Sequence, residues 1–466
     1  MKKQMLIVLL LMMITTAGMW AQTTTPPAAG DGTSGNPYQI ASLDNLAWLS
    51  QNSGEWDKYY IQTADIDATD TQNWNSGEGF SPIGNNPDFF TGSYDGQGYE
   101  TDGLYINRPS NDYQGLFGYT YGAEISNLGV TNTNITGLNR IGGLVGYNVS
   151  NSTITNSYST GSVSGGSMIG GLVGINNSST ITNSYSTGSA TGSSYYTGGL
   201  VGSNFISTII NSYSTGSVTG SDNYTGGLVG INNSSTITNS YSTGSVNGTY
   251  YIGGLVGYNF YYSNITNSYS TGSVNGTYYI GGLVGKSYHY SNITNSYSTG
   301  SVSGSSYIGG LVGQNQIFST IANSFWDTQT SGRSYSAGGT GKTTAEMQTM
   351  STFTNAGWDF MGETANGTDD YWGINRVDND AYPWLSWQGY SLAPEIPQNV
   401  VIEIVGTNIQ ITWDAVVNAN SYIIFASNEP AGTFTDVSNS GTFVGESWSD
   451  AITETKKFYY VKASSD

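Results

Sequence analysis

The sequence predicts an all-β protein: a right-handed parallel β-solenoid with capping segments, followed by a β-sandwich. The main observation is a repeat. The pentad GGLVG recurs in steps of 28 residues with one step of 27, beginning at Gly142, Gly170, Gly198, Gly226, Gly253, Gly281 and Gly309. A second motif, NSYSTGS, follows the same period, and Thr, Tyr, Val and Ile dominate between the turns, as in strands. A fixed period indicates stacked units that bury their apolar faces against one another.

One repeat has the length of one solenoid coil. At about 3.3 Å per residue, it accommodates two or three short strands with turns, and successive coils stack as parallel strands about 4.8 Å apart. Crossovers between parallel strands are strongly biased to the right hand, which sets the expected hand of the coil. A propeller is disfavoured because its blades need about 40 residues.

Equivalent residues of successive coils are expected to form ladders. An amide ladder is predicted at Asn156, Asn183, Asn211, Asn239, Asn267, Asn295 and Asn323. An aromatic stack closed by Phe325 is predicted at Tyr158, Tyr185, Tyr213, Tyr241, Tyr269 and Tyr297. Alternation places Ile154, Asn156 and Tyr158 on one face, so we expect the stack to be buried. The glycines are expected at tight corners or close backbone approaches. Sequons at Asn134, Asn264 and Asn292 permit glycosylation, but the ladder explains the repetition better.

The repeat resembles the GLUG repeat, a family named for its Gly-Leu-any-Gly motif. The GLVG at residues 143–146 and its six later copies carry this resemblance, as does GLFG at residues 115–118. The flanks also resemble those of secreted bacterial proteins with this repeat, at Phe80–Gly84, Phe90–Tyr99 and Ser324–Gly332. The resemblance covers most of residues 36–390. It implies a solenoid-like fold and a surface location, and it brings no catalytic residue.

Residues 1–21 read as a secretory signal peptide. Lys2 and Lys3 precede an apolar run at Met5–Ile14, and Ala21 is the expected last residue before cleavage. The run is shorter than the roughly 20 residues that a membrane span needs, and no second run follows. We therefore expect a secreted or cell-surface protein with no transmembrane segment after cleavage. Residues 22–35 read as a Pro/Gly/Thr linker.

Composition narrows the function further. The chain of 466 residues has a net charge of −20, which argues against a nucleic-acid partner. It has no cysteine, so neither a disulfide nor a cysteine-linked lipid anchor is possible.

Residues 36–114 are predicted to form the N-terminal cap and the first irregular coils. The segment Ile40–Leu49 has helical apolar spacing, with Ser42 as the N-cap, and would cover the open end of the solenoid. Asp65, Asp67 and Asp70 are spaced so that they could contribute to a calcium site, but a complete calcium-binding loop is missing. The alternative is a solvated loop.

Residues 115–325 are predicted as the solenoid and residues 326–391 as its C-terminal cap. The sequence GGTGKT at residues 338–343 invites comparison with a phosphate-binding loop, but Ser336 stands where the first glycine is required. Thr343 and Glu346 instead have the spacing of a capping box for a short helix. Four tryptophans are expected to close the rod, with sugar binding as the alternative: Trp358, Trp372, Trp384 and Trp387.

Residues 394–466 show alternating strands at 400–405, 408–413, 421–426 and 457–463. They resemble a fibronectin type III domain in the motifs Pro397-x-Asn399-Val400, ITW at 411–413, SY at 421–422 and YYV at 459–461. The resemblance implies that Trp413 and Tyr460 are core residues. The chain stops where the last strand is expected, so this domain is predicted to be incomplete or to expose a sheet edge.

The repeats offer almost no groups for catalysis. Between Gly142 and Gly313 the only Asp, Glu, Lys, Arg or His residues are Asp222, Lys286 and His289. Acid–base catalysis and the common glycosidase mechanism need positioned, usually paired, titratable groups. The chain has one histidine, so an HExxH metal motif is excluded. We predict no enzyme, with no catalytic, metal, nucleotide or other cofactor site.

The predicted function is that of a non-catalytic surface or secreted rod, adhesive or structural. The alternatives are a glycan-binding module and the non-catalytic part of a larger surface enzyme, with glycans or extracellular proteins as partners. The candidate binding stripe is Tyr250, Tyr251, Tyr278, Tyr279 and Tyr307, with earlier copies at Tyr195, Tyr196 and Tyr224. Adjacent strand residues point to opposite faces, so one of each pair is expected to face solvent. Alternatively, these rings only pack or favour strand structure.

Overall fold

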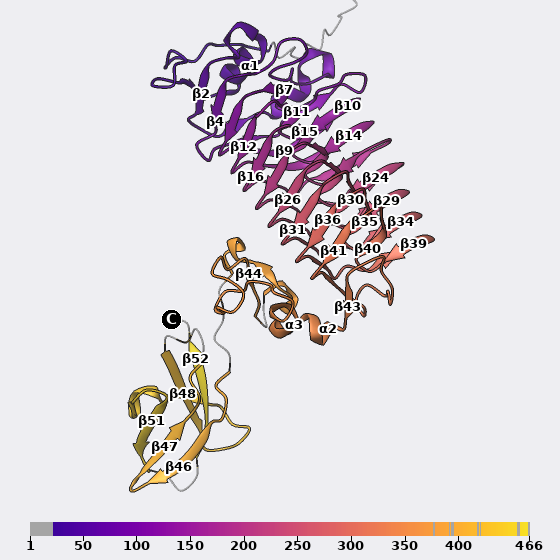
Figure 1. The fold of residues 1–466 in the computed structure, drawn as a ribbon. Helices are drawn as coiled ribbons and strands as arrows, with labels where there is room; N and C mark the ends of the chain where they lie inside the picture. The colour runs from indigo at the N-terminus through magenta and orange to yellow at the C-terminus, as the bar shows by residue number, and fades with distance from the viewer. Residues whose placement is uncertain are drawn as a thin grey trace, which may run out of the picture. The chain divides into compact units, whose positions relative to one another are not determined.

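The computed structural model describes residues 22–375, 378–390, 392, 396–416, 419, 421–453 and 457–464. Figure 1 shows the fold. The predicted signal peptide lies outside the described residues. Tertiary contacts divide the chain into a unit that ends at Gly341 and a unit that begins at Lys342. Among the described residues, no helix is long and apolar enough to cross a membrane.

The first unit is a parallel β-solenoid, as predicted. One of its sheets has eight strands, one for each GLVG or GLFG copy. A coil has four runs of strand rather than two or three, as in β10 (Asn139–Gly142), β11 (Val145–Val149), β12 (Thr153–Thr155) and β13 (Tyr158–Gly165). Val145 pairs with Val173 and Ile154 with Ile181, so one repeat is one coil. The right hand of the coil stays a prediction.

Four series of strands run along the solenoid. The first contains β10, β14 (Ser167–Gly170), β19 (Thr197–Gly198), β24 (Asn223–Gly226), β29 (Tyr250–Gly253), β34 (Tyr278–Gly281) and β39 (Ser306–Gly309). The second contains β7 (Phe117–Tyr121), β11, β15 (Val173–Asn177), β20 (Val201–Phe205), β25 (Val229–Asn233), β30 (Val256–Phe260), β35 (Val284–Tyr288) and β40 (Val312–Gln316).

The third series extends to the N-terminal end. It contains β1 (Tyr38–Ile40), β2 (Tyr59–Gln62), β4 (Ser93–Asp95), β8 (Glu124–Ser126), β12, β16 (Thr180–Thr182), β21 (Thr208–Ile210), β26 (Thr236–Thr238), β31 (Asn264–Thr266), β36 (Asn292–Thr294) and β41 (Thr320–Ala322).

The fourth series is made of short strands in which most coils contribute two. It contains β3 (Ile66–Asp67), β5 (Glu100–Asp102), β6 (Tyr105–Asn107), β9 (Gly129–Thr136), β13, β17 (Tyr185–Ser186), β18 (Ser189–Gly192), β22 (Tyr213–Ser214), β23 (Val218–Gly220), β27 (Tyr241–Ser242), β28 (Val246–Asn247), β32 (Tyr269–Ser270), β33 (Val274–Asn275), β37 (Tyr297–Ser298), β38 (Val302–Ser303), β42 (Phe325–Asp327) and β43 (Thr340–Lys342).

Rows of identical aliphatic side chains fill the interior. The leucine of GGLVG and the isoleucine of the third series are fully buried in every complete repeat, as at Leu228 and Ile237. The glycines of GGLVG serve close approach rather than turns. Gly170 does not have a positive φ, but a Cβ there would lie 2.0 Å from the carbonyl oxygen of Val173 and 2.7 Å from that of Leu200. Each glycine therefore lets successive coils stack at strand spacing.

The predicted amide ladder is present in its first part, at the corner before the fourth series. It does not continue to Asn239, because, within the described residues, Oδ1 of Asn211 accepts no hydrogen bond. Asn183 donates to Oδ1 of Asn156 at 3.1 Å, and Asn211 donates to Oδ1 of Asn183 at 3.1 Å. Asn156 itself donates to Asn127, so the ladder begins one coil earlier than predicted. These residues have φ near +50°, a left-handed conformation that asparagine tolerates. Asparagine therefore makes this corner of the coil.

A second amide ladder, which the sequence analysis missed, runs through the buried interior. The side chains donate from coil to coil at 2.9–3.0 Å through Asn148, Asn176, Asn204, Asn232 and Asn259. Each of these side chains is fully buried. The signal for it was an asparagine two residues after the GGLVG pentad, and it ends where Ser287 takes that position. Buried amide groups need hydrogen-bond partners, and here each side chain bonds to the equivalent asparagine of a neighbouring coil.

The tyrosine stack forms, but the prediction that it is buried is wrong for most of its length. Ring centroids from Tyr158 to Tyr297 lie 4.7–5.0 Å apart with interplanar angles of 1–9°. Tyr158, Tyr185, Tyr213 and Tyr241 are only half-buried, while Ser157 and Ser159 point inward. The left-handed corner at Asn156 interrupts the alternation, so Ile154 faces the core and Tyr158 faces outward.

The N-terminal cap follows the prediction. Helix α1 (Leu43–Gln51) begins after Ser42, whose side chain accepts a hydrogen bond from the N–H of Asn45 at 3.3 Å. Leu46, Ala47 and Leu49 enter the solenoid core, and Figure 1 shows α1 at the N-terminal end of the coils. The segment 22–35, predicted as a linker, is hydrogen-bonded to this end. The N–H of Thr25 donates to the carbonyl oxygen of Asp44, and the N–H of Tyr59 donates to the carbonyl oxygen of Gly32 at 3.0 Å.

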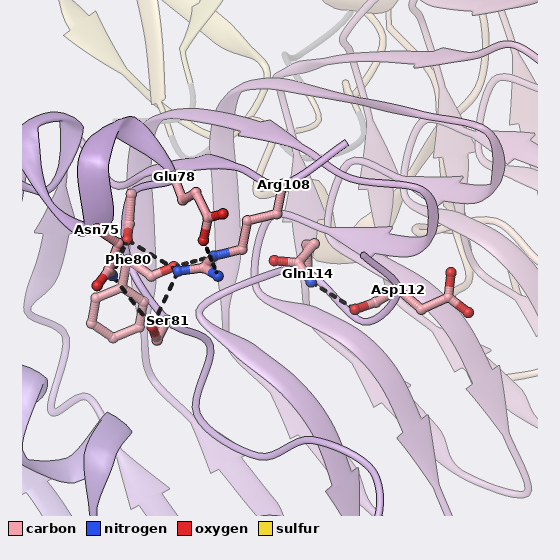
Figure 2. A network of polar contacts seen from close by, with 8 residues as sticks. Asn75, Glu78, Phe80, Ser81, Arg108, Asp112 and Gln114 are labelled. Carbon is pink, nitrogen blue, oxygen red and sulfur yellow. Dashed lines mark hydrogen bonds and ion pairs between the residues drawn. The ribbon is translucent and has the colours of Figure 1, made fainter. Parts of the chain in front are cut away.

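Arg108 stabilises the irregular first coils (Figure 2). Its guanidinium pairs with Glu78 at 2.8 Å and donates to the carbonyl oxygen of Phe80 at 3.3 Å and to Oγ of Ser81 at 3.2 Å. Asn75 donates to the carbonyl oxygen of Gly79 at 2.7 Å in the same loop. Arg108 is only 15% exposed, so this network is structural and its charge is neutralised internally.

The second unit begins with two short helices, α2 (Thr344–Met347) and α3 (Met350–Thr354). The predicted capping box is present: Glu346 accepts from the N–H of Thr343 at 2.8 Å. Three of the four tryptophans predicted to close the rod are fully buried. The rings of Trp358 and Trp372 lie 4.6 Å apart, and Phe353 lies 4.8 Å from Trp358. Here β44 (Trp372–Gly373) pairs with β45 (Trp384–Leu385).

The described strands between Val401 and Ser464 form two antiparallel sheets. One contains β46 (Val401–Val405), β47 (Asn408–Thr412), β51 (Ser447–Ala451) and β50 (Thr442–Phe443), and the other β49 (Thr435–Asp436), β48 (Ser421–Ser427) and β52 (Phe458–Ser464). Trp413 joins their shared core, as predicted. Tyr460 does not. It is 44% exposed, because strand alternation turns Val461 inward and leaves Tyr460 stacked on Phe425 outside.

The outward position of the tyrosine stack predicts its contribution to stability. Tyr241→Ala removes a ring that stacks on two neighbours, so two aromatic pairs are lost. At about 0.5–1.5 kcal/mol per pair, it should lower the free energy of unfolding by about 1–3 kcal/mol. Ile237→Ala in the same coil empties a core position and should cost about 2–5 kcal/mol. Denaturant unfolding of both variants checks this order. Equal losses would place Tyr241 in the core.

The buried amide ladder makes a second prediction. Asn204 accepts from Asn176 and donates to Asn232, so Asn204→Ala leaves two buried amide groups without their partner. At about 1–3 kcal/mol for each unsatisfied group, we expect a loss of about 2–5 kcal/mol. Asn183→Gly is the matched control in the exposed ladder, where water replaces the amide and glycine accepts the positive φ. A control loss as large as that of Asn204→Ala would contradict the distinction.

Candidate functional site

The predicted stripe lies on the first strand series of the solenoid. Tyr250 begins β29, Tyr278 begins β34, and each is followed by a second tyrosine. One ring of each pair is exposed, as expected, but the other, at Tyr251 or Tyr279, is half-buried outside the core instead of directed inward. Tyr251 and Tyr279 have φ of 57° and 59°, and this left-handed residue reverses the usual alternation.

The tyrosines form two parallel rows. The outer row contains Tyr250 and Tyr278, with ring centroids 5.0 Å apart and planes 7° apart. The inner row runs through Tyr196, Tyr224, Tyr251, Tyr279 and Tyr307, with centroids 4.7–5.2 Å apart. Tyr250 and Tyr278 are each 37% exposed and Tyr307 is 55% exposed. We call both rows together the tyrosine stripe.

Stacking determines which parts of the tyrosine rings a ligand can contact. Within the inner row, ring planes differ by 4–15° from Tyr224 to Tyr307, so neighbouring rings cover one another's faces. The faces that would stack on a sugar ring are therefore occupied along the row. Ring edges and phenol hydroxyls remain for contact with a ligand.

Lys286 borders the inner row on the adjacent strand series. In the register of β30, β35 and β40 it lies between Tyr258 and Gln314. Its Nζ atom lies 4.8–5.9 Å from the centroids of four rings, those of Tyr251, Tyr258, Tyr279 and Tyr288. These distances are typical of cation–π contacts. Partial burial lowers the pKa of Lys286.

A second exposed aromatic group lies at the corner between β30 and β31 and between β35 and β36. Tyr262 stacks on Tyr290 at 5.2 Å, and Tyr290 on Phe318 at 5.1 Å, while His289 stacks on Tyr261 at 4.7 Å. Phe318 is 74% exposed. This group was not predicted from the sequence, although its aromatic residues recur one repeat apart at this place.

The other candidate residues have structural partners. Asp67 accepts from the N–H of Thr69 at 2.9 Å and from its hydroxyl at 2.6 Å, which lowers the pKa of Asp67. Asp65 accepts from the N–H of Glu100 at 2.9 Å. In the part of the chain that the structure describes, no three acidic, histidine or cysteine side chains are grouped to hold a metal. Lys342, in the GGTGKT sequence, pairs with Glu346 at 3.3 Å.

Comparison with known proteins identifies the repeat. The model of the family described as the GLUG motif matches residues 137–164, 193–219, 221–247, 248–275 and 276–303. Halomucin from Haloquadratum walsbyi is 38% identical over 122 residues, covering 25% of this chain and 1% of halomucin. A Gly-rich membrane protein from Evansella cellulosilytica is 38% identical over 111 residues, covering 23% of this chain and 12% of that protein. This chain thus spans a small part of these relatives.

Two solved structures are also similar in part. One is described as an immunoglobulin A1 protease from Bacteroides ovatus, with 18% identity and a TM-score of 0.44, covering 77% of this chain and 94% of that chain. The other, an IgA1 protease, has 19% identity and a TM-score of 0.38, covering 62% of this chain and 21% of that chain. The match to the family model identifies the coils at residues 137–164, 193–219 and 221–303 as GLUG repeats.

Stacking also predicts the response of the rod to alkali. Burial raises the pKa of Tyr213 and of Tyr224 to about 12, above the ordinary value of 10. Between these values the unfolded chain releases phenol protons that the folded chain keeps, so rising pH favours unfolding. Stability should be unaffected by these groups below about pH 10 and should fall between about pH 10 and pH 12.

Denaturant midpoints followed across this pH range, with phenolate absorbance recorded in parallel, check the prediction. Tyr224→Phe removes one such group and should make the decline less steep. If all tyrosines of the folded chain ionise together near pH 10, the stacked rows are not shielded from water.

Proposed function

We propose that this chain belongs to a non-catalytic secreted or cell-surface repeat protein that attaches to extracellular glycans or proteins through the tyrosine stripe. The predicted signal peptide and the GLUG repeats support this proposal, together with relatives named as a halomucin and a Gly-rich membrane protein. The scarcity of titratable groups in the repeats supports a non-catalytic role for the rod.

The observation that carries the proposal is the repetition of exposed tyrosines at one place in successive coils. A single exposed ring offers a weak contact, but a row of equivalent contacts on one rigid scaffold gains strength by avidity. Tyrosine also provides a large contact area with little loss of side-chain entropy. The stripe therefore suits a shallow surface that holds an extended partner.

We also propose that residues 394–466 are a fibronectin type III-like spacer. Its support is the pair of antiparallel sheets around Trp413, Ile424 and Trp448. In a longer surface protein, this chain would act as a non-catalytic segment, and the small share of each relative that it covers is consistent with that arrangement.

The test replaces exposed members of the stripe. Tyr250→Ser, Tyr278→Ser and Tyr307→Ser, combined in one variant, should reduce attachment to a glycan array or to extracellular matrix by about tenfold or more, because avidity is lost. The matched control carries Tyr158→Ser, Tyr185→Ser and Tyr213→Ser in the other tyrosine stack. Circular dichroism establishes that both variants fold.

The two variants distinguish the stripe from the rod as a whole. Attachment should be lost with the stripe variant and kept with the control. Unchanged attachment of the folded stripe variant would exclude the stripe as the binding surface. Equal losses in both variants would indicate a general effect on the rod.

A further inference from the structure

The chemistry that the tyrosine stripe presents indicates its class of ligand, if the stripe binds as proposed above. An aromatic ring is electron-rich on its faces and electron-poor at its edge. Stacking at 4.7–4.9 Å covers the faces of Tyr251 and Tyr279 with neighbouring rings. The surface then consists of electropositive edges and of hydroxyls that can donate hydrogen bonds. Such a surface favours oxygen-rich and anionic groups over the apolar face of a sugar.

Lys286 adds a full positive charge to this surface. Within the described residues, its ammonium group has no carboxylate partner and no hydrogen bond, and its contacts are the four tyrosine rings. The other ammonium and guanidinium groups described above differ: Lys342 pairs with Glu346, and Arg108 with Glu78. Lys286 is thus a half-buried cation held by ring contacts. It can receive an anion from a ligand.

The coils that carry the stripe hold one acidic side chain, that of Asp222, which lies at the Tyr224 end of the stripe. Of the 32 acidic residues of the chain, Asp222 is the only one between Gly142 and Gly313. The net charge of −20 therefore arises outside the repeats. At physiological salt, charges further away than about 8 Å are largely screened. The local field at the stripe is set by Lys286, by Asp222 beside Tyr224, by the hydroxyls and by the ring edges.

We propose that the tyrosine stripe binds anionic polysaccharides, carboxylated or sulfated, which lie along the solenoid axis with an acidic group at Lys286. The rows repeat the same hydroxyl from coil to coil, and a ligand that itself repeats can use each copy. The phenol hydroxyls of Tyr250 and Tyr278 donate to sugar oxygens, and the Lys286 ammonium binds the acidic group. This inference rests on the proposed function and specifies its ligand.

The test uses two polymers that differ in whether their carboxyl groups are charged or methyl-esterified. Polygalacturonate and its methyl ester share one backbone, and heparin supplies a sulfated arm. Surface plasmon resonance with the full chain should show stronger binding of polygalacturonate than of the ester, and weaker binding at higher salt. Lys286→Gln should reduce binding of polygalacturonate about tenfold, the effect of losing one charge-assisted hydrogen bond, and leave binding of the ester unchanged.

Three further variants separate charge, hydroxyls and fold. Lys286→Arg keeps the charge and should keep the preference for the acidic polymer. Tyr250→Phe with Tyr278→Phe keeps the stacked rings and removes two hydroxyls, so it should weaken binding of both polymers. Lys342→Gln is the matched control, because it removes a lysine charge outside the repeats, and it should change nothing.

The outcomes also separate this inference from the proposed function. Equal binding of the acid and the ester, or no effect of Lys286→Gln, overturns the inference, while sensitivity to the serine variant of the stripe still supports a binding surface. Equal binding of poly-glutamate would show that charge alone is recognised and would overturn the assignment to polysaccharides. Absence of binding to polygalacturonate and to heparin also overturns it.

Discussion

The structure depends on one constraint: each side chain of the repeat lies against its own copy one strand spacing away. Amides, hydroxyls, aromatic rings and aliphatic groups can pair with themselves at about 4.8 Å, whereas like charges at that distance repel. This explains why the repeats contain almost no charged residues. Lys286 is tolerated because its neighbours in register are Tyr258 and Gln314. The fold by itself therefore accounts for the scarcity of catalytic groups in the repeats.

The same constraint selects the residues at the corners of the coil. A corner that turns through the left-handed region favours asparagine over most side chains, and the Asn156, Asn183 and Asn211 amides also bond to one another. Backbone conformation and self-pairing thus favour the same residue. At the pentad, glycine is required for another reason, because any Cβ at Gly170 would collide with a carbonyl oxygen. Asparagine at the corner and glycine in the pentad are therefore repeated for different physical reasons.

We expect function on the outer surface. There, too, the repeat favours side chains that can pack against their own copies, so few residue types are available. Stacked tyrosines satisfy the constraint and still present hydroxyls to solvent. Because the rings cover one another, the surface differs from an aromatic platform that binds sugars by ring stacking. Lys286 and the exposed aromatic corner around Tyr262, Tyr290 and Phe318 depart from strict repetition, and such departures give individual coils a distinct chemistry.

The period, the strand-forming composition and the cap signals determined the solenoid, the outer amide ladder, the α1 helix after Ser42 and the capping box at Thr343. These features depend on local spacing, which a sequence displays directly. Only the tertiary structure decided which way several side chains point. The corner at Asn156 turns Tyr158 outward, and the positive φ of Tyr251 leaves both tyrosines of a pair outside the core. Alternation predicts orientation within an uninterrupted strand, and a single left-handed residue reverses it.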